Sequence, residues 1–304
     1  MNGPHNEIGC APCPKCCLCA HEGLLIHSNL RDRLFGASGS WNLKKCVNPA
    51  CGLAWLDPMP LPQEIGKAYV QYYTHATSPT TKQETRRKRL SRFVKEGYWA
   101  TKYRYKTSRK SGLAQRIGIL LYLSPIHRRE ADAEIRCLSA VPNGRLLDVG
   151  CGSGEWLLTM QKRGWQVEGL DFDANAVKAA EARGVHVRIG SLEDQRFPDN
   201  YFNAITLSHV IEHVPDPAAT IEECFRVLKP GGTVVLLTPN NDSLSHRIFK
   251  GSWRGLEPPR HLHIFSLRSM ELLLANTGFR PRVVRPCIVT SVIYDSLLLR
   301  WGRS

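Results

Sequence analysis

Residues 146–154 read Leu146-Leu147-Asp148-Val149-Gly150-Cys151-Gly152-Ser153-Gly154, a short apolar run that ends in three closely spaced glycines. An apolar run of this length predicts a buried strand. Glycines admit positive φ angles and let the backbone approach a ligand closely, so they predict a tight turn after the strand. The next residues, Ser153 to Arg163, have helical spacing and end at Gly164. The stretch therefore predicts the strand, turn and helix of an α/β fold.

The same alternation of short apolar runs and amphipathic segments continues to residue 237. We expect strands at Arg145–Val149, Gln166–Leu170, Val185–Ile189, Phe202–Leu207 and Thr233–Leu237. We expect helices at Ser153–Arg163, Ala174–Arg183 and Pro217–Leu228, with stops at Gly164, Gly184 and Pro230-Gly231-Gly232. Strands that alternate with helices indicate a Rossmann-like, doubly wound α/β sheet that is mostly parallel.

An acidic residue ends the second expected strand. Asp171 lies 21 residues after Gly150, at a position where a carboxylate accepts hydrogen bonds from a ribose diol in doubly wound folds. The glycines are spaced G-x-G-x-G behind Asp148, whereas the dinucleotide fingerprint is G-x-G-x-x-G. The pattern predicts a nucleoside ligand. The alternative is a sheet with glycine turns that binds no cofactor.

Two further segments complete the pattern. Ser191-Leu192-Glu193-Asp194 follows the third expected strand, and His209-Val210-Ile211-Glu212-His213 follows the fourth. Together with the glycine turn and Asp171, these segments resemble the class I S-adenosylmethionine-dependent methyltransferases over about half of the chain. The resemblance implies the cofactor S-adenosylmethionine and a methyl transfer reaction.

The resemblance also implies which residues bind this cofactor. They are Asp148 near the methionine amino group, Gly150, Gly152 and Gly154 against the methionine, Asp171 at the ribose, Ser191, Leu192 and Glu193 at the adenine, and His209 at the cofactor border. Two positions depart from the family pattern, because Ser191 and Asn203 stand where the family often has Asp. We expect the change at Ser191 to weaken a contact with the adenine without abolishing binding.

Histidines are the candidate catalytic groups. Methyl transfer is an in-line displacement in which the protein positions the acceptor, and a hydroxyl acceptor must also lose a proton. The candidate bases are His213, His261 and His263, because an unperturbed imidazole has a pKa of about 6.5. His261 and His263 lie in the segment Glu257–Phe265, which resembles one common in the family. The alternative is that these histidines pack or form hydrogen bonds within a lid.

The segment His209–His213 also matches the H-x-x-E-H pattern of inverted zinc peptidases, in which two histidines on one helical face bind zinc. Pro215 would end such a helix almost at once. The methyltransferase resemblance explains the same segment without a metal, and we prefer that explanation.

Cysteines are concentrated near the start of the chain. Seven of the 11 precede residue 52, namely Cys10, Cys13, Cys16, Cys17, Cys19, Cys46 and Cys51. Met1 to Gly23 lacks the basic start and apolar core of a secretion signal, so disulfides are the weaker explanation. The pairs Cys16-x2-Cys19 and Cys46-x4-Cys51 predict a structural four-cysteine zinc site. The alternative is that these cysteines are free.

Two choices exist for the first ligand pair of this site, because Cys13-x2-Cys16 has the same spacing as Cys16-x2-Cys19. The residues after Cys19, Ala20 to Gly23, resemble the turn usually found there, which favours Cys16 and Cys19. The run Cys46–Pro60 looks like the zinc-ribbon-like segment that precedes many bacterial methyltransferases of this class. Such a closed site stabilises its module and performs no chemistry.

Positive charge is also uneven. The chain has a formal net charge of +14, and Lys82 to Lys110 alone holds 12 basic and two acidic residues. Such a run attracts polyanions. The aromatic residues interleaved with it allow a nucleic-acid modifier or binder as an alternative function. Related bacterial methyltransferases often carry a basic helical segment here, which favours a solvated helix face or a lid. A third interpretation is peripheral membrane contact through this run and Ile117–Leu123.

We therefore expect three regions: a zinc-ribbon-like module at 10–62, a helical basic lid or linker at 63–141, and a methyltransferase domain at 142–304. A hydrophobic content of 42% and a charged content of 22% exclude a wholly disordered or fibrous chain. No apolar run approaches the roughly 18 to 20 residues of a membrane span, and we expect a cytoplasmic protein. Arg282–Arg285 and Ile288–Ile293 could form a closing hairpin, unless that sheet edge is incomplete or helical.

The expected activity is methyl transfer from S-adenosylmethionine to a small-molecule or glycan-type acceptor at oxygen. The sequence does not distinguish a sugar from a quinone, a lipid head group or a secondary metabolite. RNA methylation or binding through the basic run is the alternative.

Overall fold

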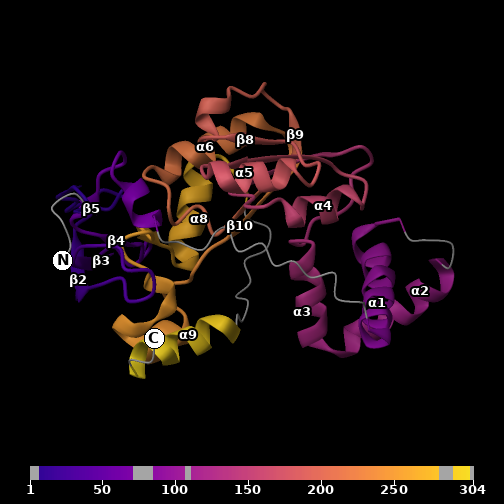
Figure 1. Ribbon diagram of the computed structural model, residues 1–304, viewed down its shortest axis with the longest axis horizontal. Coiled ribbons are helices and arrows are strands. Elements are labelled where there is room, and N and C mark those ends of the chain that lie inside the picture. Colours follow the sequence, from indigo (N-terminus) through magenta and orange to yellow (C-terminus); the bar gives the residue numbers. More distant parts are fainter. Residues whose placement is uncertain (1–6, 71–84, 107–110, 281–289, 302–304) are drawn as a thin grey trace. The chain divides into compact units, whose positions relative to one another are not determined.

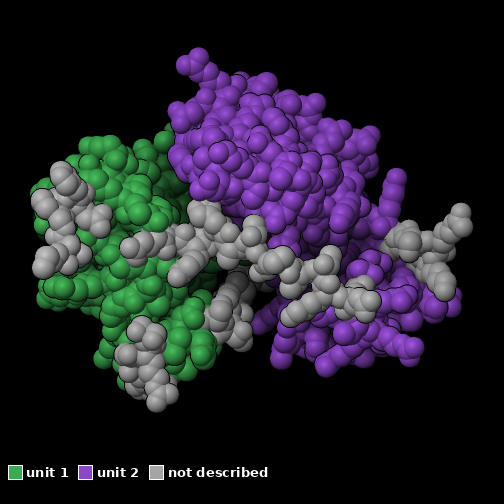
Figure 2. Space-filling model, in the orientation of Figure 1, with its two compact units in different colours: residues 1–73, 209–225, 236–304 green, residues 74–208, 226–235 purple. Residues whose placement is uncertain are grey.

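The computed structural model describes residues 7–70, 85–106, 111–280 and 290–301. The chain folds into two compact units (Figure 2). Unit 1 comprises Met1–Tyr73, His209–Phe225 and Leu236–Ser304, and unit 2 comprises Thr74–Ser208 and Arg226–Val235. These units do not test the three-part division along the sequence, which stays a prediction.

Unit 2 is built on a five-stranded sheet with the strand order β10-β9-β6-β7-β8 (Figure 1). The strands are β6 (Arg145–Val149), β7 (Gln166–Asp171), β8 (Val187–Ile189), β9 (Phe202–Ser208) and β10 (Leu228–Leu237). The pairs β6/β7, β6/β9 and β7/β8 are parallel. The chain moves outward from β6 in one direction and returns through β9 on the other side of β6. This reversal is the point at which doubly wound sheets bind ligands. The expected α/β fold class is confirmed.

The strands begin where the sequence predicts them, with two exceptions. β8 begins at Val187, two residues late, and β10 begins at Leu228 instead of Thr233. β10 therefore includes the Pro230-Gly231-Gly232 stop. The edge position of β10 explains this difference, since an edge strand tolerates proline and glycine better than a central strand does.

Helices α4 (Glu155–Gln161) and α5 (Ala174–Glu181) contact β7, and α5 also contacts β8. Each is slightly shorter than predicted. The short helix η4 (Glu193–Gln195) follows β8.

The region 63–141 is largely helical where it is described. It contains η2 (Ile65–Tyr69) in unit 1 and α1 (Arg86–Tyr103), α2 (Ser111–Gly118), η3 (Ile119–Leu123) and α3 (Pro125–Glu134) in unit 2. The aromatic residues of the basic run pack into the core of unit 2, where Tyr98 and Trp99 join Leu146 and Trp165. Residues 82–84 and 107–110 of this run lie outside the described residues.

Unit 1 contains a four-stranded antiparallel sheet with the order β11-β4-β3-β2. Its strands are β2 (Gly23–Leu30), β3 (Trp41–Cys46), β4 (Ala54–Leu56) and β11 (His263–Ile264). A second, two-stranded sheet pairs β1 (Cys10–Ala11) with β5 (Met59–Pro60). β11 pairs with β4 through His263 opposite Trp55, so residues from distant parts of the sequence complete one sheet.

Further helices of unit 1 follow β9 in the chain. They are α6 (Pro217–Val227, of which Arg226 and Val227 belong to unit 2), α7 (Leu244–Phe249), η5 (Lys250–Ser252), η6 (Arg254–Leu256), α8 (Leu267–Asn276) and α9 (Thr290–Trp301). The predicted hairpin strand Arg282–Arg285 and residues 288 and 289 lie outside the described residues. Residues 290–293 begin α9, so of the two alternatives given for this segment, a strand or a helix, the structure has the helix. No helix in the described part of the chain has the length and apolar character needed to cross a bilayer.

Candidate active site

The glycine turn after β6 has the conformation that its sequence requires. Gly150, Gly152 and Gly154 have φ angles of 69°, 54° and 72°, in the left-handed region that favours glycine. The amides of Gly150 and Cys151 donate to the carbonyl oxygen of Leu170 at 2.8 and 3.0 Å. Apart from its chain neighbours, no described atom lies within 4 Å of the position that a Cβ on Gly152 would occupy. The turn therefore leaves open space beside Gly152.

Asp171 lies at the end of β7 and is bonded to the same turn. Its Oδ2 accepts a hydrogen bond from the amide of Gly152 at 2.7 Å, and its Oδ1 accepts one from the amide of Asp173 at 3.0 Å. Burial raises the pKa of Asp171, and these two amide hydrogen bonds act in the opposite direction. A carboxylate oxygen has two lone pairs, so each oxygen of Asp171 keeps one for a ligand.

The segment after β8 places its three predicted residues differently. Leu192 is buried, whereas Ser191 is partly exposed and Glu193 is exposed. The hydroxyl of Ser191 donates to Asp194 Oδ2 at 2.6 Å, and it accepts from the amide of Asp194 at 3.2 Å. The hydroxyl of Ser191 therefore holds the local turn.

Asp148 is buried at the end of β6, and two side chains bind it. Arg136 forms an ion pair with its Oδ1, and the hydroxyl of Thr206 donates to the same atom at 2.7 Å. The guanidinium of Arg136 also lies 3.6 Å from the centre of the Trp156 ring. Burial raises the pKa of Asp148, while the charge of Arg136 lowers it. The acid that was expected to hold an amino group is thus paired with an arginine.

In unit 1, the segment after β9 forms a turn and no helix. His209 has a φ angle of 56°, and its side chain is 58% exposed. Its Nδ1 lies 3.3 Å from Glu212 Oε1. Glu212 is fully buried, and its Oε2 has no hydrogen-bond partner among the described residues. Burial acts to raise the pKa of Glu212, but the hydrogen bond from His209 and the nearby histidine charges lower it overall.

The structure brings two predicted bases together, His213 and His261. Their ring centres are 4.7 Å apart, and a ligand atom of each lies within 4.8 Å of the other and of a Glu212 carboxylate oxygen. His213 Nδ1 lies 2.9 Å from Tyr69 Oη and 3.0 Å from the carbonyl oxygen of Arg260. A carbonyl oxygen can only accept, which assigns the proton of His213 to Nδ1 and leaves a lone pair on Nε2.

His261 also carries its proton on Nδ1, because that atom lies 2.8 Å from the carbonyl oxygen of Gly255. Its Nε2 lies 3.7 Å from Glu257 Oε2. Burial and, to a smaller extent, the neighbouring His261 lower the pKa of His213 to about 4. His213 is therefore a neutral imidazole near neutral pH.

The third predicted base, His263, has other neighbours. Its Nε2 lies 3.4 Å from the carbonyl oxygen of Pro215, and its Nδ1 lies 4.0 Å from Cys17 Sγ. The side chain is buried, and burial lowers its pKa to about 4.

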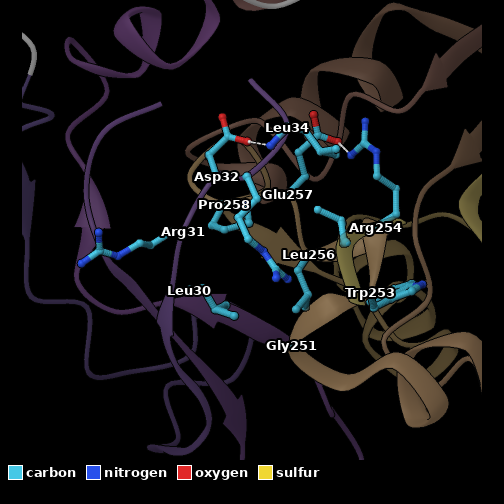
Figure 3. Close-up of a pocket in the computed structure, with 12 residues that line it drawn as sticks. Leu30, Arg31, Asp32, Leu34, Gly251, Trp253, Arg254, Leu256, Glu257 and Pro258 are labelled. Atoms are coloured by element: carbon cyan, nitrogen blue, oxygen red, sulfur yellow. Dashed lines mark hydrogen bonds and ion pairs between the residues drawn. The ribbon is translucent and has the colours of Figure 1, made fainter. Parts of the chain in front are cut away.

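A small pocket with a cavity volume of about 20 Å³ lies in unit 1 and is lined in part by Asp32, Arg254 and Glu257 (Figure 3). The fully buried Arg260 binds Asp32 Oδ2 at 2.9 Å and Glu257 Oε1 at 3.0 Å. Burial acts to raise the pKa of Glu257, but His261, Arg254 and Arg260 together lower it to about 2. One carboxylate, Glu257, thus contacts both the pocket and His261.

The four predicted metal ligands, Cys16, Cys19, Cys46 and Cys51, form one cluster in unit 1. Cys16 Sγ lies 3.7 Å from Cys51 Sγ, and Cys19 Sγ lies 3.4 Å from Cys46 Sγ. Four thiolates around zinc at about 2.3 Å are separated by about 3.8 Å, so the spacing suits a tetrahedral site. Cys13 is not part of the cluster.

Burial of the cluster is uneven, since Cys16, Cys46 and Cys51 are buried and Cys19 is partly exposed. The hydrogen bond with Cys51 lowers the pKa of Cys16 to about 5. Ser266 connects the cluster to α8, because its hydroxyl donates to the carbonyl oxygen of Cys51 at 3.0 Å.

Comparison with known proteins places these sites in a family. The family model described as a methyltransferase domain matches residues 120–283, which is more than half of the chain. The chain belongs to this methyltransferase family. A ubiquinone biosynthesis O-methyltransferase of Alkalilimnicola ehrlichii is 33% identical over 133 residues, covering 41% of this chain and 53% of that protein.

A protein of the same name from Xanthomonas campestris is 41% identical over 108 residues, covering 33% of this chain and 45% of the relative. This methyltransferase chain thus spans about half the length of the curated relatives it matches. A solved S-adenosylmethionine-dependent methyltransferase from Mesorhizobium loti has 22% identity and a TM-score of 0.45, covering 57% of this chain and 91% of that one.

The chain thus carries a class I S-adenosylmethionine-dependent methyltransferase domain, and its residues fit the cofactor that the family implies. The turn beside Gly152 is open, and Asp171 keeps two lone pairs. Arg136 adds a cation beside the turn-proximal Asp148. These groups match a ligand that carries a ribose diol, an ammonium and a carboxylate.

Several residues at the two candidate sites, one in each unit, were not predicted. Arg136 and Trp156 gave no local signal, because a single arginine after a helix is common on surfaces. Phe172 could have been predicted, because an aromatic residue directly follows Asp171 in the sequence. Its side chain is 70% exposed. Tyr69 reaches His213 from far away in the sequence, which no local pattern could indicate.

Proposed function

We propose that this methyltransferase transfers the methyl group of S-adenosylmethionine to a hydroxyl oxygen of a small-molecule or glycan-type acceptor. The observation that carries the proposal is the set of the buried Glu212 and His261 with the partly exposed His213, which offers imidazole lone pairs and a carboxylate within 4.8 Å of one another. Hydroxyl acceptors need a proton removed as the new bond forms, whereas more nucleophilic acceptors do not.

The cofactor residues have defined tasks in this proposal. Asp171 accepts hydrogen bonds from the ribose hydroxyls, and the open glycine turn admits the methionine part beside Gly152. Arg136 holds the carboxylate of the cofactor and Asp148 its ammonium, and Phe172 and Leu192 flank the adenine with Ser191 and Glu193. When bound, the cofactor supplies an electrophilic methyl group on its sulfonium.

The histidine pair removes and holds the proton. His213 is neutral near neutral pH, and its Nδ1 proton is fixed by the Arg260 carbonyl, so Nε2 is the basic atom. Glu212 is ionised and buried, which stabilises the positive charge on either ring after proton transfer. His263 is held by Pro215 and the Cys17 thiol, and we assign it a structural role.

One further observation supports this acceptor class. The relatives named above are O-methyltransferases of a small molecule by name, although the match covers about half of their length.

We propose that the cysteine cluster holds a structural zinc ion through Cys16, Cys19, Cys46 and Cys51. We also retain the division of the chain into a zinc-ribbon-like segment at 10–62, a helical segment at 63–141 and the cofactor-binding region at 142–304. In this arrangement the zinc stabilises the turns before β4 and takes no part in methyl transfer.

The burial of aromatic residues counts against RNA as the acceptor. Stacking on exposed aromatic rings is the usual means of binding single-stranded bases. Tyr98, Trp99, Tyr103 and Tyr105 are at most 6% exposed, so none of them offers a stacking face.

The test is methyl transfer from labelled S-adenosylmethionine into a fractionated cell extract, with label measured in small-molecule, lipid, RNA and protein fractions. We expect label in the small-molecule or lipid fraction and its loss in the variant His213→Gln combined with His261→Gln. Arg268→Gln serves as a matched surface control, because its side chain is 60% exposed. Nuclease-sensitive label would instead establish RNA as the acceptor and refute the proposal.

A further inference from the structure

A cluster of apolar side chains is exposed on the helices that precede the sheet of unit 2. Between residues 113 and 126 six large apolar or aromatic side chains are 44–82% exposed. We call this set the α2–α3 patch, and it consists of Leu113, Ile119, Leu120, Tyr122, Leu123 and Ile126. Single exposed leucines are common, whereas six large apolar or aromatic side chains exposed within 14 residues indicate a binding surface.

The local backbone explains why these side chains are exposed. Residues 119–123 form the short helix η3, which has three residues per turn. Successive side chains therefore point around the helix, and only Leu121 turns into the core. An ordinary surface helix carries polar residues at its exposed positions, but η3 carries Ile119, Leu120, Tyr122 and Leu123 there.

The patch stands on a rigid base. A Cβ on Gly97 of α1 would lie 1.7 Å from the carbonyl oxygen of Ala114 in α2, so the two helices touch through their backbones (Figure 1). The ring of Tyr98 packs edge-on against Tyr122 at 5.4 Å. The hydroxyl of Tyr98 donates to the buried Asp132 of α3 at 2.7 Å. These contacts hold the apolar side chains in place on the outside of the helices.

Cationic side chains lie on the helices that carry the patch and on α1, which contacts α2 and η3. Over residues 85–106 and 111–130, lysine and arginine outnumber aspartate and glutamate by twelve to two. The guanidinium of Arg128 lies 5.9 Å from the centre of the Tyr122 ring, and Arg116 and Arg129 are exposed on α2 and α3. The first turns of α1 add five exposed cations, namely Arg86, Arg87, Lys88, Arg89 and Arg92.

We infer that the α2–α3 patch docks the protein on the surface of an anionic lipid bilayer. Leucine and isoleucine side chains enter the boundary between head groups and acyl chains, tyrosine suits the interface, and the arginines bind lipid phosphates. RNA satisfies the cations but offers no hydrocarbon to the apolar side chains. A second copy of this chain would bring an equally cationic surface against the first, which charge repulsion opposes.

The test uses the full chain in flotation with two kinds of vesicle, phosphatidylcholine alone and phosphatidylcholine mixed with phosphatidylglycerol. We expect the wild type to float with the anionic vesicles and to stay unbound with the neutral ones. The variant Leu120→Glu with Leu123→Glu should bind at least about tenfold more weakly, because it puts two charges into the apolar part of the contact. Arg116→Glu with Arg129→Glu should lose the preference for anionic lipid.

The matched control is Leu24→Glu with Leu25→Glu, which makes the same change at two exposed leucines on β2 of unit 1. It should float like the wild type. Binding of S-adenosylhomocysteine and circular dichroism show that each variant is folded.

Three results would overturn the inference. The first is a wild-type chain that floats with neither vesicle. The second is equal flotation of the wild type and the Leu120 and Leu123 variant. The third is a wild-type oligomer in light scattering that the same variant converts to a monomer, which would make the patch an interface between copies.

Discussion

The assignment of Asp171 to the cofactor ribose can be tested by two substitutions of different severity. Asp171→Asn keeps an oxygen acceptor but removes the charge, while Asp171→Ala removes both oxygens. In the structure each oxygen accepts one amide hydrogen bond, at 2.7 Å from Gly152 and 3.0 Å from Asp173, and keeps one lone pair for the ribose diol. A hydrogen bond to a charged group contributes about 1.5–3 kcal/mol. Loss of the ribose contacts in Asp171→Ala should therefore weaken cofactor binding by about 3 kcal/mol, or about 100-fold. Asp171→Asn should weaken it by about tenfold.

The assay is isothermal titration with S-adenosylhomocysteine, accompanied by thermal unfolding of each variant. Asp171→Ala also leaves two amides of the turn without their acceptor, so unfolding measurements separate a damaged turn from a lost ligand contact. Glu168→Gln is the matched control, because Glu168 lies on the same strand three residues away and its side chain contacts Arg188. We expect its affinity to equal that of the wild type. Equal affinity of wild type and Asp171→Ala would refute the assignment of this site.

Three further predictions concern the metal, the histidines and the buried ion pairs. Purified protein should contain one zinc per chain by atomic emission. Cys51→Ser should lose the zinc and lower the Tm by more than about 5 °C, whereas the control Cys10→Ser should change neither the zinc content nor the Tm. The folded-state pKa of His213 is about 4, and an unfolded histidine has a pKa of about 6.5, so the unfolded state binds the proton first as pH falls. The stability contribution of the neutral ring is therefore present above pH 6.5 and is lost towards pH 4. Between pH 7 and 5 the free energy of unfolding, measured in urea, should fall by about 2 kcal/mol less in His213→Gln than in the wild type. Arg260→Met should destabilise the fold by about 3–5 kcal/mol, because the buried Asp32 loses its ion pair and Glu257 loses one of its two arginine partners, Arg254 and Arg260. The exposed Arg268→Met should change the free energy of unfolding by less than about 1 kcal/mol. Unchanged stability of Arg260→Met in urea unfolding would contradict this reasoning.

Local sequence patterns predicted the parts of the fold that depend on neighbouring residues. The strand at Arg145–Val149 has the predicted bounds, and the glycine turn after it has the predicted positive φ angles. Both follow from burial and backbone sterics within a few residues. The start of β10 was missed because the tolerance of an edge strand for Pro230 depends on which strands lie beside it.

Long-range contacts account for what the sequence did not indicate. Arg136, the ion-pair partner of Asp148, lies just after α3, and local spacing does not bring it to the sheet. Tyr98 and Trp99 belong to the basic run, and they fill the core of unit 2 because one face of α1 packs inward. The pairing of His213 with His261 depends on the loop that leads into β11.

The pairing of β11 with β4 also sets the order of events during biosynthesis. Trp55 and His263 are neighbours in the sheet, yet more than 200 residues separate them in the chain. At a synthesis rate of about 5–20 residues per second, the open edge of β4 waits about 10–40 s for its partner strand. An unpaired strand edge is a template for association with other chains. The yield of folded protein should therefore depend on how well nascent chains are kept apart during that interval, and slower initiation or a lower protein concentration should raise it.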